Sequence, residues 1–264
     1  MAEIIGIANQ KGGVGKTTTA VNLAASLALN DKKVLLLDFD SQANATLSLG
    51  FKRSMINHSI ISVIQGRKKI KEIIQPTLID TLFIAPTDQN LIAVEKEFYN
   101  QEKGFREKIL SQCLQEIRNE YDFIIIDSAP ALGPLTINVL VVSDSVIIPV
   151  QCEYFALDGI AQLLNTIKIL KPSYNPKLQI RGFLPTMFSP QNNLSKQVLE
   201  ELSLNNFKFF KDENGEIIVI PRTIRLAEAP SYGKPIALYE KKSSGNIAYM
   251  KLAQAILKEK KYKI

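Results

Sequence analysis

Hydrophobic residues in this chain gather in short runs that charged or turn-forming residues separate. The first run contains Ile4, Ile5 and Ile7 and predicts a short buried strand close to the N-terminus. Later runs predict further strands at residues 34–37, 81–85, 123–126, 145–150, 178–184 and 217–220. The run at 81–85 is closed by Pro86, which marks the end of that strand.

Segments with helical periodicity lie between these strands. After the first strand, apolar residues recur at helical spacing at Ala20, Leu23, Ala24, Leu27 and Ala28. The pattern predicts an amphipathic helix at 104–120 and another helix over about 156–170, which we expect Pro172 to end, whereas residues 51–79 are less regular. This alternation predicts an α/β fold with a doubly wound, mostly parallel sheet and helices on both faces. Without repeats or low-complexity linkers, residues 1–264 are expected to form a single domain.

The composition excludes several classes of protein. No apolar run reaches 18 residues, so no membrane span is predicted, and the early first strand leaves no room for a signal peptide. Cys113 and Cys152 are too few and too far apart for a disulfide framework or a zinc site. His58 is the only histidine, which excludes a histidine-based catalytic triad. We therefore expect a cytoplasmic protein.

A glycine-rich segment follows the first strand and opens the first helix. Residues 11–18 read Lys-Gly-Gly-Val-Gly-Lys-Thr-Thr. Such a turn aims successive backbone N–H groups at a phosphate, and the positive end of the helix dipole adds to the attraction. Lys16 is expected to reach the terminal phosphates, and the Thr17 hydroxyl to hold Mg²⁺. The sequence therefore predicts a nucleotide site whose phosphate loop also includes Gly12, Gly13, Val14, Gly15 and Thr18.

Acidic residues follow two of the predicted strands, at the edge of the sheet where such folds bind ligands. Asp127 comes directly after four apolar residues, in the pattern of a Walker B carboxylate that orients Mg²⁺. Taken alone, this pattern also fits an ordinary strand end with a turn aspartate. Asp38 and Asp40 follow the strand at 34–37. The two segments therefore supply the candidate acidic chemistry.

The phosphate loop departs from the general spacing. Gln10 stands where that pattern has glycine, and an additional lysine, Lys11, begins the loop. In this respect the chain resembles the deviant Walker A ATPases, the family of ParA, MinD and the nitrogenase iron protein. The resemblance implies a nucleotide-sandwich dimer in which Lys11 reaches the partner's phosphates. The alternative is a solvated loop lysine.

The resemblance covers essentially the whole chain and implies roles for more residues. Residues 38–44 resemble switch I of the family, which makes Asp40 the candidate for orienting the attacking water and gives Asp38 a structural or Mg²⁺-shell role. Residues 128–138 look like switch II of ParA. The segments 191–195, 220–230 and 233–235 are similar to signatures of the small, chromosomal Soj-type ParA proteins. In that family the adenine contacts fall at Pro221 and Thr223.

Positive charge is concentrated at the C-terminal end of the chain. Residues 222–264 contain ten Lys or Arg and three Glu, a net charge of +7, whereas the preceding residues carry −1. Such an excess is what binding to a phosphate backbone needs, although for residues 258–263 a solvated terminal face is the favoured interpretation. The resemblance implies DNA contacts at Lys196, Arg222, Arg225 and Lys242.

Together these features predict a chromosome- or plasmid-partitioning ATPase with slow basal turnover. Its homodimer, bridged by ATP and Mg²⁺, is expected to bind double-stranded DNA without sequence preference and to be associated with the nucleoid. A ParB-type centromere-binding partner is expected to stimulate hydrolysis and thereby release the DNA. No membrane partner is expected.

Three other classes of protein are weaker alternatives. A MinD-like, membrane-associated cell-division ATPase would end in an amphipathic helix. Here an apolar stripe typical of core packing is formed by Ala248, Leu252, Ala255 and Ile256, and residues 259–264 lack a bulky apolar face. A metabolic ligase or synthase would need a small-molecule pocket that the sequence does not identify. A nitrogenase-like reductase would need cysteines in a cluster-ligating context.

Overall fold

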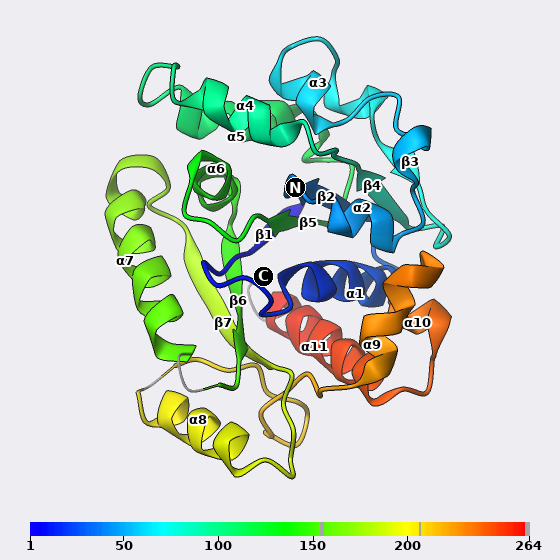
Figure 1. The fold of residues 1–264 in the computed structure, drawn as a ribbon, viewed down its shortest axis with the longest axis vertical. Coiled ribbons are helices and arrows are strands. Elements are labelled where there is room, and N and C mark those ends of the chain that lie inside the picture. The colour runs from blue at the N-terminus through cyan, green and yellow to red at the C-terminus, as the bar shows by residue number, and fades with distance from the viewer. Residues whose placement is uncertain (154–155, 206, 262–264) are drawn as a thin grey trace.

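One sheet of seven strands forms the centre of the molecule (Figure 1), in a computed structural model that describes residues 1–153, 156–205 and 207–261. The spatial order is β3-β4-β2-β5-β1-β6-β7. The strands span Glu3–Ile7 (β1), Val34–Phe39 (β2), Gln75–Pro76 (β3), Leu82–Ala85 (β4), Phe123–Ser128 (β5), Ser145–Gln151 (β6) and Gln179–Thr186 (β7). All neighbours pair in parallel except β3, which is antiparallel to β4. The predicted α/β fold is confirmed.

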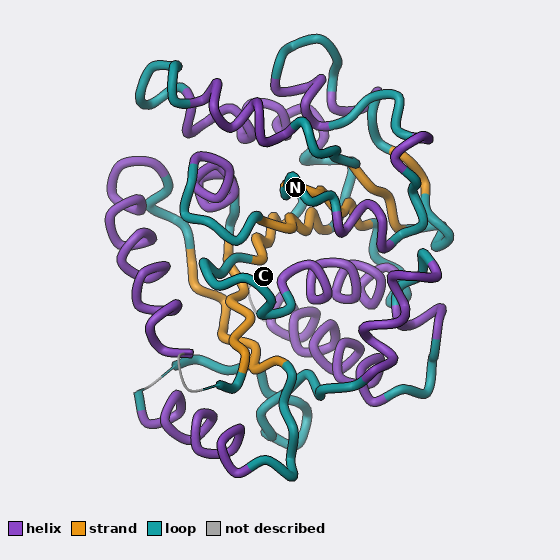
Figure 2. The backbone as a smooth tube through the Cα atoms, viewed as in Figure 1, coloured by secondary structure: helices purple, strands orange, loops and turns teal. Residues whose placement is uncertain are grey.

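Helices cover both faces of this sheet (Figure 2). One face carries α1 and α11, with α9 and α10 beside them, and the other carries α3, α4, α5 and α6 (Figure 1). Helices α7 and α8 pack beside β6 and β7. The helices span Lys16–Ala28 (α1), Asn44–Ser48 (α2), Ile60–Ile64 (α3), Leu91–Phe98 (α4), Ile109–Leu114 (α5), Pro134–Val142 (α6), Ala156–Tyr174 (α7), Asn193–Leu204 (α8), Ile224–Glu228 (α9), Ile236–Tyr239 (α10) and Ser244–Lys261 (α11).

The central strands are buried on both faces, which explains why they are nearly continuous apolar runs. Consecutive residues of a strand point to opposite faces of its sheet. Ile5 accordingly packs in the cluster under α1 and α11, whereas Ile4 packs in the cluster under the helices of the opposite face. A single polar residue in such a strand would face one of these cores, so the polar residues collect at the strand ends.

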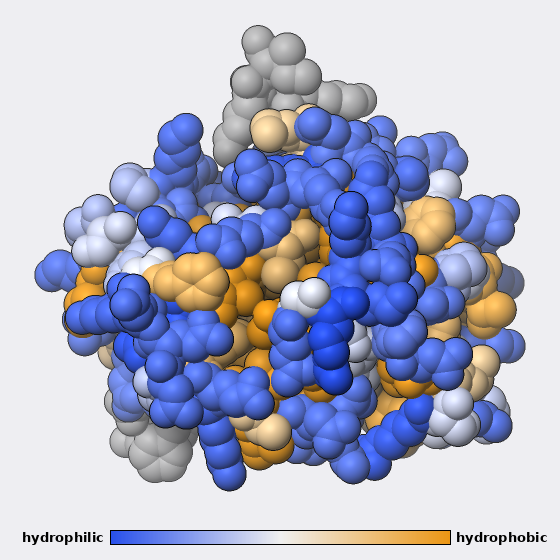
Figure 3. All heavy atoms as spheres, turned by 90° about the horizontal axis from the view of Figure 1, so that it is seen from above, coloured by the Kyte–Doolittle hydropathy of each residue, from blue (hydrophilic) through white to orange (hydrophobic). Residues whose placement is uncertain are grey.

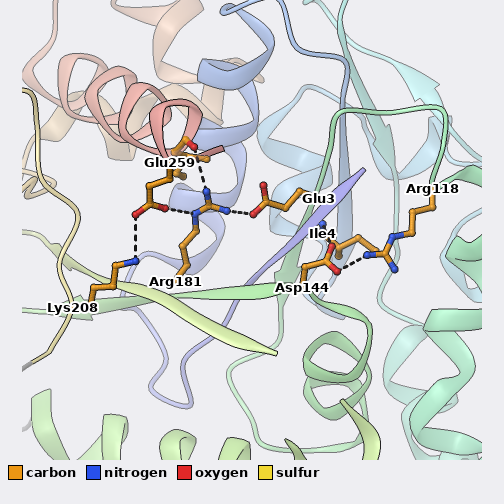
Figure 4. Close-up of polar contacts among 8 residues, drawn as sticks. Glu3, Ile4, Arg118, Asp144, Arg181, Lys208 and Glu259 are labelled. Carbon is orange, nitrogen blue, oxygen red and sulfur yellow. Dashed lines mark hydrogen bonds and ion pairs between the residues drawn. The ribbon is translucent and has the colours of Figure 1, made fainter. Parts of the chain in front are cut away.

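An arginine network fixes the amino end of the sheet (Figure 4). Arg181 of β7 is buried and pairs with Glu3 of β1 and, at 3.2 Å, with Glu259 of α11. Lys208 adds a 3.3 Å ion pair to the same Glu259 carboxylate. Burying a guanidinium without partners would cost free energy, so these ion pairs hold β1, β7 and α11 together at this end of the sheet. The opposite, carboxyl end of the sheet is left for a ligand.

The predicted helix at 104–120 is wrong as a single helix. The structure has a 3₁₀ turn at Arg106–Lys108, then α5, then a second 3₁₀ turn at Gln115–Ile117. Asn138 of α6 causes the break: its side chain donates to the carbonyl of Arg106 at 2.8 Å and accepts from the N–H of Leu110 at 3.1 Å. These are the two groups that a continuous helix would join to each other, so the inserted amide interrupts the helical ladder.

Two further predicted boundaries need correction. Helix α7 continues past Pro172 and ends at Tyr174, because a proline near a helix end removes only one hydrogen bond. The predicted strand at 217–220 is not a strand of the sheet. Ile217 forms only an isolated bridge with Lys211, on either side of a turn that contains Gly215. The other predicted strands correspond to β1, β2, β4, β5, β6 and β7 within two residues at each end.

The apolar stripe of α11 lies in the core, as its spacing predicted. Leu252 and Ile256 are fully buried and pack in the same cluster as residues of α1. The prediction that residues 259–264 lack a bulky apolar face concerns in part residues 262–264, which lie outside the described residues. Among the described helices, none has the length and apolar character to cross a membrane. On the face shown in Figure 3, hydrophilic side chains predominate, with hydrophobic atoms visible between them near its centre.

Candidate nucleotide-binding site

The strand order brings the predicted phosphate loop and the predicted carboxylates together. β5 lies between β1 and β2, and its register pairs Asp127 with Ile7 on one side and with Asp38 on the other. The loop at 11–18 begins shortly after Ile7, and Asp40 lies two residues beyond Asp38. All of these residues therefore meet at the carboxyl edge of the sheet, as expected for ligand sites in this architecture.

The glycines of the loop leave its backbone open. Gly13 and Gly15 have φ angles of 74° and 86°, in the left-handed region that side chains rarely adopt. A Cβ atom at Gly12 or Gly13 would meet no described atom within 4 Å, so open space adjoins the backbone. At the N-terminus of α1, no described side chain caps the helix and no acidic residue lies in the first turn. Thr17 and Thr18 lie in this first turn, and the free N–H groups form a cradle for a phosphate.

Lys16 lies inside the loop. Its side chain is almost fully buried, and Nζ donates to the carbonyl oxygen of Lys11 at 2.9 Å. Burial lowers the pKa of Lys16, whereas the charges of Asp127 and Asp40 oppose this change. The ammonium is thus held close to both carboxylates within the loop.

Lys11 has different surroundings. Its N–H donates to Oδ1 of Asn9 at 3.0 Å, and the Asn9 amide in turn donates to the carbonyl of Pro149 at 2.7 Å. The backbone of Lys11 is therefore anchored, but its side chain is 35% exposed, and its ammonium lies 3.6 Å from the Glu153 carboxylate. In the single chain, the ammonium of Lys11 contacts a surface carboxylate near the rim of the site.

Asp127 is a fully buried carboxylate with few polar neighbours. Neither oxygen has a hydrogen bond of normal geometry within the described part of the chain, and the Thr17 hydroxyl is the neutral group that stabilises its charge. Burial raises the pKa of Asp127 well above its usual value, Asp38 adds to the rise, and Thr17 and Lys16 oppose it. A buried charge without a partner is costly, and a cation would remove this cost. Carboxylate and hydroxyl oxygens are suitable ligands for Mg²⁺, so Asp127 and Thr17 fit the predicted ion.

Asp38 organises the loop that follows β2. Oδ2 accepts hydrogen bonds from the N–H and the hydroxyl of Thr46 at 2.8 and 2.7 Å, and Oδ1 accepts from the N–H of Asp40 at 3.2 Å. The Thr46 hydroxyl also accepts from the N–H of Thr87 at 3.2 Å. Burial raises the pKa of Asp38 to about 6, although the bonds from Thr46 lower it. These contacts fix the loop in which Asp40 lies.

Asp40 itself is buried and lies close enough to Lys16 for its charge to act on that ammonium. Its Oδ1 accepts from the N–H of Gln42 at 3.0 Å. Its other carboxylate oxygen has no hydrogen-bond partner among residues 1–153, 156–205 and 207–261. Ala43 adopts a φ of 56°, a strained value for alanine that closes the turn. One oxygen of Asp40 is therefore held while the other is available to a ligand or water.

A cavity of about 340 Å³ adjoins the loop and has the size of a small-ligand site. Pro221 and Thr223, the predicted adenine contacts, both line it. Its other lining residues come from α1, the end of β7, the 220–227 segment and α11: Gly15, Thr18, Thr186, Met187, Ile220, Arg222, Ile224, Leu226, Ala227 and Tyr249. The cavity therefore lies directly beside the phosphate loop, next to Gly15 and Thr18.

Two residues beside the phosphate loop, Thr186 and Tyr249, were not predicted from the sequence. Thr186 donates to the carbonyl of Val14 at 2.8 Å and so ties β7 to the phosphate loop. The buried hydroxyl of Tyr249 lies 3.2 Å from the Thr19 hydroxyl, between α11 and α1. Thr186 could have been found, because it follows an apolar run as Asp127 does. Tyr249 carries no comparable signal in the sequence.

All four candidate DNA-contacting residues are exposed. Arg222 and Arg225 lie at α9, and Lys242 lies between α10 and α11. Arg225 pairs with Glu228 at 3.0 Å on this surface. Lys196 lies on α8, which stands apart from α9 and α10 (Figure 1). In the single chain these cations therefore form two separate groups.

The geometry of the site defines a class, the P-loop nucleotide-binding proteins built on a doubly wound sheet. Residues 2–180 match the family model described as an AAA domain. The chain is 45% identical to the chromosome partitioning protein ParA of Myxococcus xanthus, over 98% of this chain and 89% of that protein. It is also 45% identical to the sporulation initiation inhibitor protein Soj of Bacillus subtilis, over 97% and 98% of the two chains. The chain belongs to the ParA/Soj family of chromosome-partitioning ATPases.

The fold also occurs in an enzyme that is not named as a ParA or Soj protein. The cobyrinic acid a,c-diamide synthase of Mycobacterium smegmatis, with a bound ATP analogue and magnesium, superposes with a TM-score of 0.85 at 31% identity. The comparison covers 100% of this chain and 97% of the synthase. The fold is therefore shared with enzymes of other pathways, and the higher identity to ParA and Soj distinguishes the family within it.

Proposed function

We propose that this protein is a chromosome- or plasmid-partitioning ATPase whose ATP-bound homodimer holds DNA. The observation that carries the proposal is the contrast between the two lysines of the phosphate loop. Lys16 is buried inside the loop, whereas Lys11 has an anchored backbone and a partly exposed ammonium beside Glu153. This contrast supports the assignment of Lys16 to the chain's own nucleotide and of Lys11 to the nucleotide of a partner.

The remaining residues of the site have complementary roles in this proposal. The backbone of residues 12–18 receives the phosphates, and Pro221 and Thr223 contact the base. Asp127 and Thr17 hold Mg²⁺, which when bound neutralises charge on the phosphates. Asp40, with one free carboxylate oxygen, orients the water that attacks the terminal phosphate. The ATP analogue and magnesium named with the structurally similar synthase support this ligand set.

The distribution of exposed cations supports non-specific DNA binding by a dimer. Lys196, Arg222, Arg225 and Lys242 form small, separated groups on one chain, and few cations give weak affinity for the phosphate backbone. A homodimer doubles their number. ATP thereby controls DNA binding without contacting DNA, and a ParB-type partner that accelerates hydrolysis releases the DNA from this nucleoid-associated dimer.

Hydrolysis tests the assignment of the water-orienting residue. Asp40→Ala should bind ATP with the affinity of the wild type, while hydrolysis falls by about a hundredfold or more, the usual contribution of such a group. The rate of phosphate release measures hydrolysis, and titration with a fluorescent ATP analogue measures the affinity for ATP. Asp80→Ala, at an exposed position, is the control and should behave as the wild type. Hydrolysis at the wild-type rate in Asp40→Ala would refute the assignment.

A further inference from the structure

Asn22 lies in the middle of α1 and joins the phosphate loop to the start of α10. Its side chain is buried, and Nδ2 donates to the carbonyl oxygen of Thr18 at 2.8 Å. Oδ1 accepts from the backbone N–H of Ile236 at 2.8 Å. Ile236 is the first residue of α10, and the first N–H groups of a helix have no partner within the helix. Asn22 therefore satisfies this buried N–H group and fixes the start of α10 on α1.

The other end of α10 reaches the surface that carries the arginines. Tyr239, the last residue of α10, donates its hydroxyl to Oε2 of Glu228 at 3.0 Å. The same oxygen accepts from Nη1 of Arg225 at 3.0 Å. The ring of Tyr239 also packs against that of Tyr232, with centroids 4.9 Å apart. Hydrogen bonds and one short helix thus connect Thr18 in the phosphate loop to the guanidinium of Arg225.

A close approach of two glycines holds the turn between α9 and α10. Gly233 and Gly50 have φ angles of 64° and 87°, in the left-handed region. A Cβ atom at Gly233 would lie 2.6 Å from Cα of Gly50 and 3.1 Å from its nitrogen, so the two backbones pack with no room for a side chain. Gly50 follows α2, whose Thr46 holds the Asp38 carboxylate. The segment 229–236 is therefore held against both α1 and the segment that follows β2.

We infer that Asn22 and Tyr239 are positioning residues for DNA binding. Through α10 and Glu228 they hold the Arg225 guanidinium in a fixed place relative to the nucleotide site. The inference rests on the proposed function, in which two chains pair at their nucleotide sites and present their cations to one duplex. Such a pair gains affinity when its cations are already ordered, because immobilising a side chain on binding costs free energy. Neither Asn22 nor Tyr239 touches DNA or nucleotide in this account.

Two variants remove the two ends of this connection. Tyr239→Phe removes only the hydroxyl, and Asn22→Ala removes both side-chain hydrogen bonds. Each should weaken binding of the ATP-bound protein to a duplex by roughly tenfold, since about threefold is lost for the arginine of each chain and the two losses multiply. The affinity for a fluorescent ATP analogue and the ATP-dependent dimer in size-exclusion chromatography should remain as in the wild type. Both measurements also confirm that the variants are folded.

Matched controls and the contrary outcomes are clear. Asn30→Ala is the control for Asn22→Ala, because the Asn30 amide also donates to a carbonyl four residues earlier, at 2.8 Å, but at the far end of α1. Tyr99→Phe, at an exposed position beside α4, is the control for Tyr239→Phe. Wild-type DNA affinity in Tyr239→Phe or in Asn22→Ala overturns this inference alone, as does weaker binding that accompanies loss of the dimer. A wild type that binds no DNA with ATP overturns the proposed function as well.

A double-mutant cycle separates positioning from a direct contact with DNA. In an Arg225→Ala background, Tyr239→Phe and Asn22→Ala should have no further effect on DNA affinity, because the guanidinium that they position is absent. Fluorescence anisotropy at low salt keeps the weakened binding measurable. If either substitution weakens binding in the Arg225→Ala background by the same factor as in the wild type, it acts independently of Arg225 and the inference is wrong.

Discussion

Lys11 and Lys16 lie in one loop, five residues apart, yet one is buried and the other is partly exposed beside Glu153. Lys16→Ala should weaken ATP binding by roughly tenfold to a hundredfold, because charged hydrogen bonds contribute about 1.5–3 kcal/mol. Lys11→Ala should bind ATP normally but remain monomeric. Nucleotide titration and size-exclusion chromatography with a non-hydrolysable ATP analogue measure both properties. An ATP-dependent dimer of Lys11→Ala would exclude the sandwich arrangement.

The burial of the Asp127 carboxylate predicts a gain in stability when its charge is removed. Its pKa is raised in the folded state, so ionised Asp127 destabilises the fold at pH values above the usual aspartate range, and this penalty diminishes as the pH falls. Without nucleotide or Mg²⁺, Asp127→Asn should raise Tm at pH 7.5 by about 3 °C or more, since ~1 kcal/mol corresponds to roughly 2–4 °C at this size. The gain should shrink toward pH 5. Differential scanning calorimetry at both pH values measures it, and a lower Tm at pH 7.5 would contradict the account.

At the residue scale, local patterns identify the parts of the site that are contiguous in sequence. The phosphate loop and Asp127 could be predicted because each follows an apolar strand directly. Tyr249 could not, because its place in the site depends on two helices, α1 and α11, that pack together from distant parts of the chain. Tyr249 meets Thr19 across 230 residues of sequence.

At the scale of elements, Asn138 predicts a measurable cost for losing one side chain. Asn138→Ala would leave the buried N–H of Leu110 and the carbonyl of Arg106 without their partner, which costs about 1–3 kcal/mol for each unsatisfied buried group. Urea denaturation should therefore show a clear decrease in the free energy of unfolding. Asn205→Ala, whose exposed amide donates only to Glu201, is the matched control and should change stability little. An unfolding midpoint equal to that of the wild type would show that Asn138 does not hold the broken helix.

Strand burial and the contacts of Asn138 together explain which elements the sequence could predict. Strands with both faces buried have an unmistakable apolar pattern, and six were predicted correctly. The 104–120 segment has helical periodicity, but Asn138 from another helix decides where its hydrogen bonds go. The segment at 217–220 is apolar because Ile218 and Ile220 pack in the core cluster under α1 and α11, and only isolated hydrogen bonds, such as that from the Ile220 N–H to the Pro185 carbonyl, link it to β7. Helix α4, with only eight residues, was not predicted at all.

At the scale of the whole molecule, the fold and the family follow from the order of elements and the identity to ParA and Soj. In the function that we propose, ATP controls DNA binding by pairing two chains. The charge distribution alone could not predict this, because the net charge of +7 in residues 222–264 does not tell which exposed cations share one surface. Lys196 on α8 and the arginines at α9, for example, lie on separate parts of the surface (Figure 1).

The most direct test measures DNA binding as a function of nucleotide and salt. Asp40→Ala, which should retain ATP without hydrolysing it, is titrated against unrelated DNA duplexes with ATP, with ADP and without nucleotide, using fluorescence anisotropy. The account predicts binding only with ATP, equal on all duplexes, with each phosphate contact contributing roughly −0.9 to the log–log salt slope. Arg225→Glu in the same background should weaken binding to every duplex and flatten this slope, and adding Lys11→Ala should abolish the effect of ATP. Binding that is indifferent to ATP, or confined to one sequence, would contradict the account.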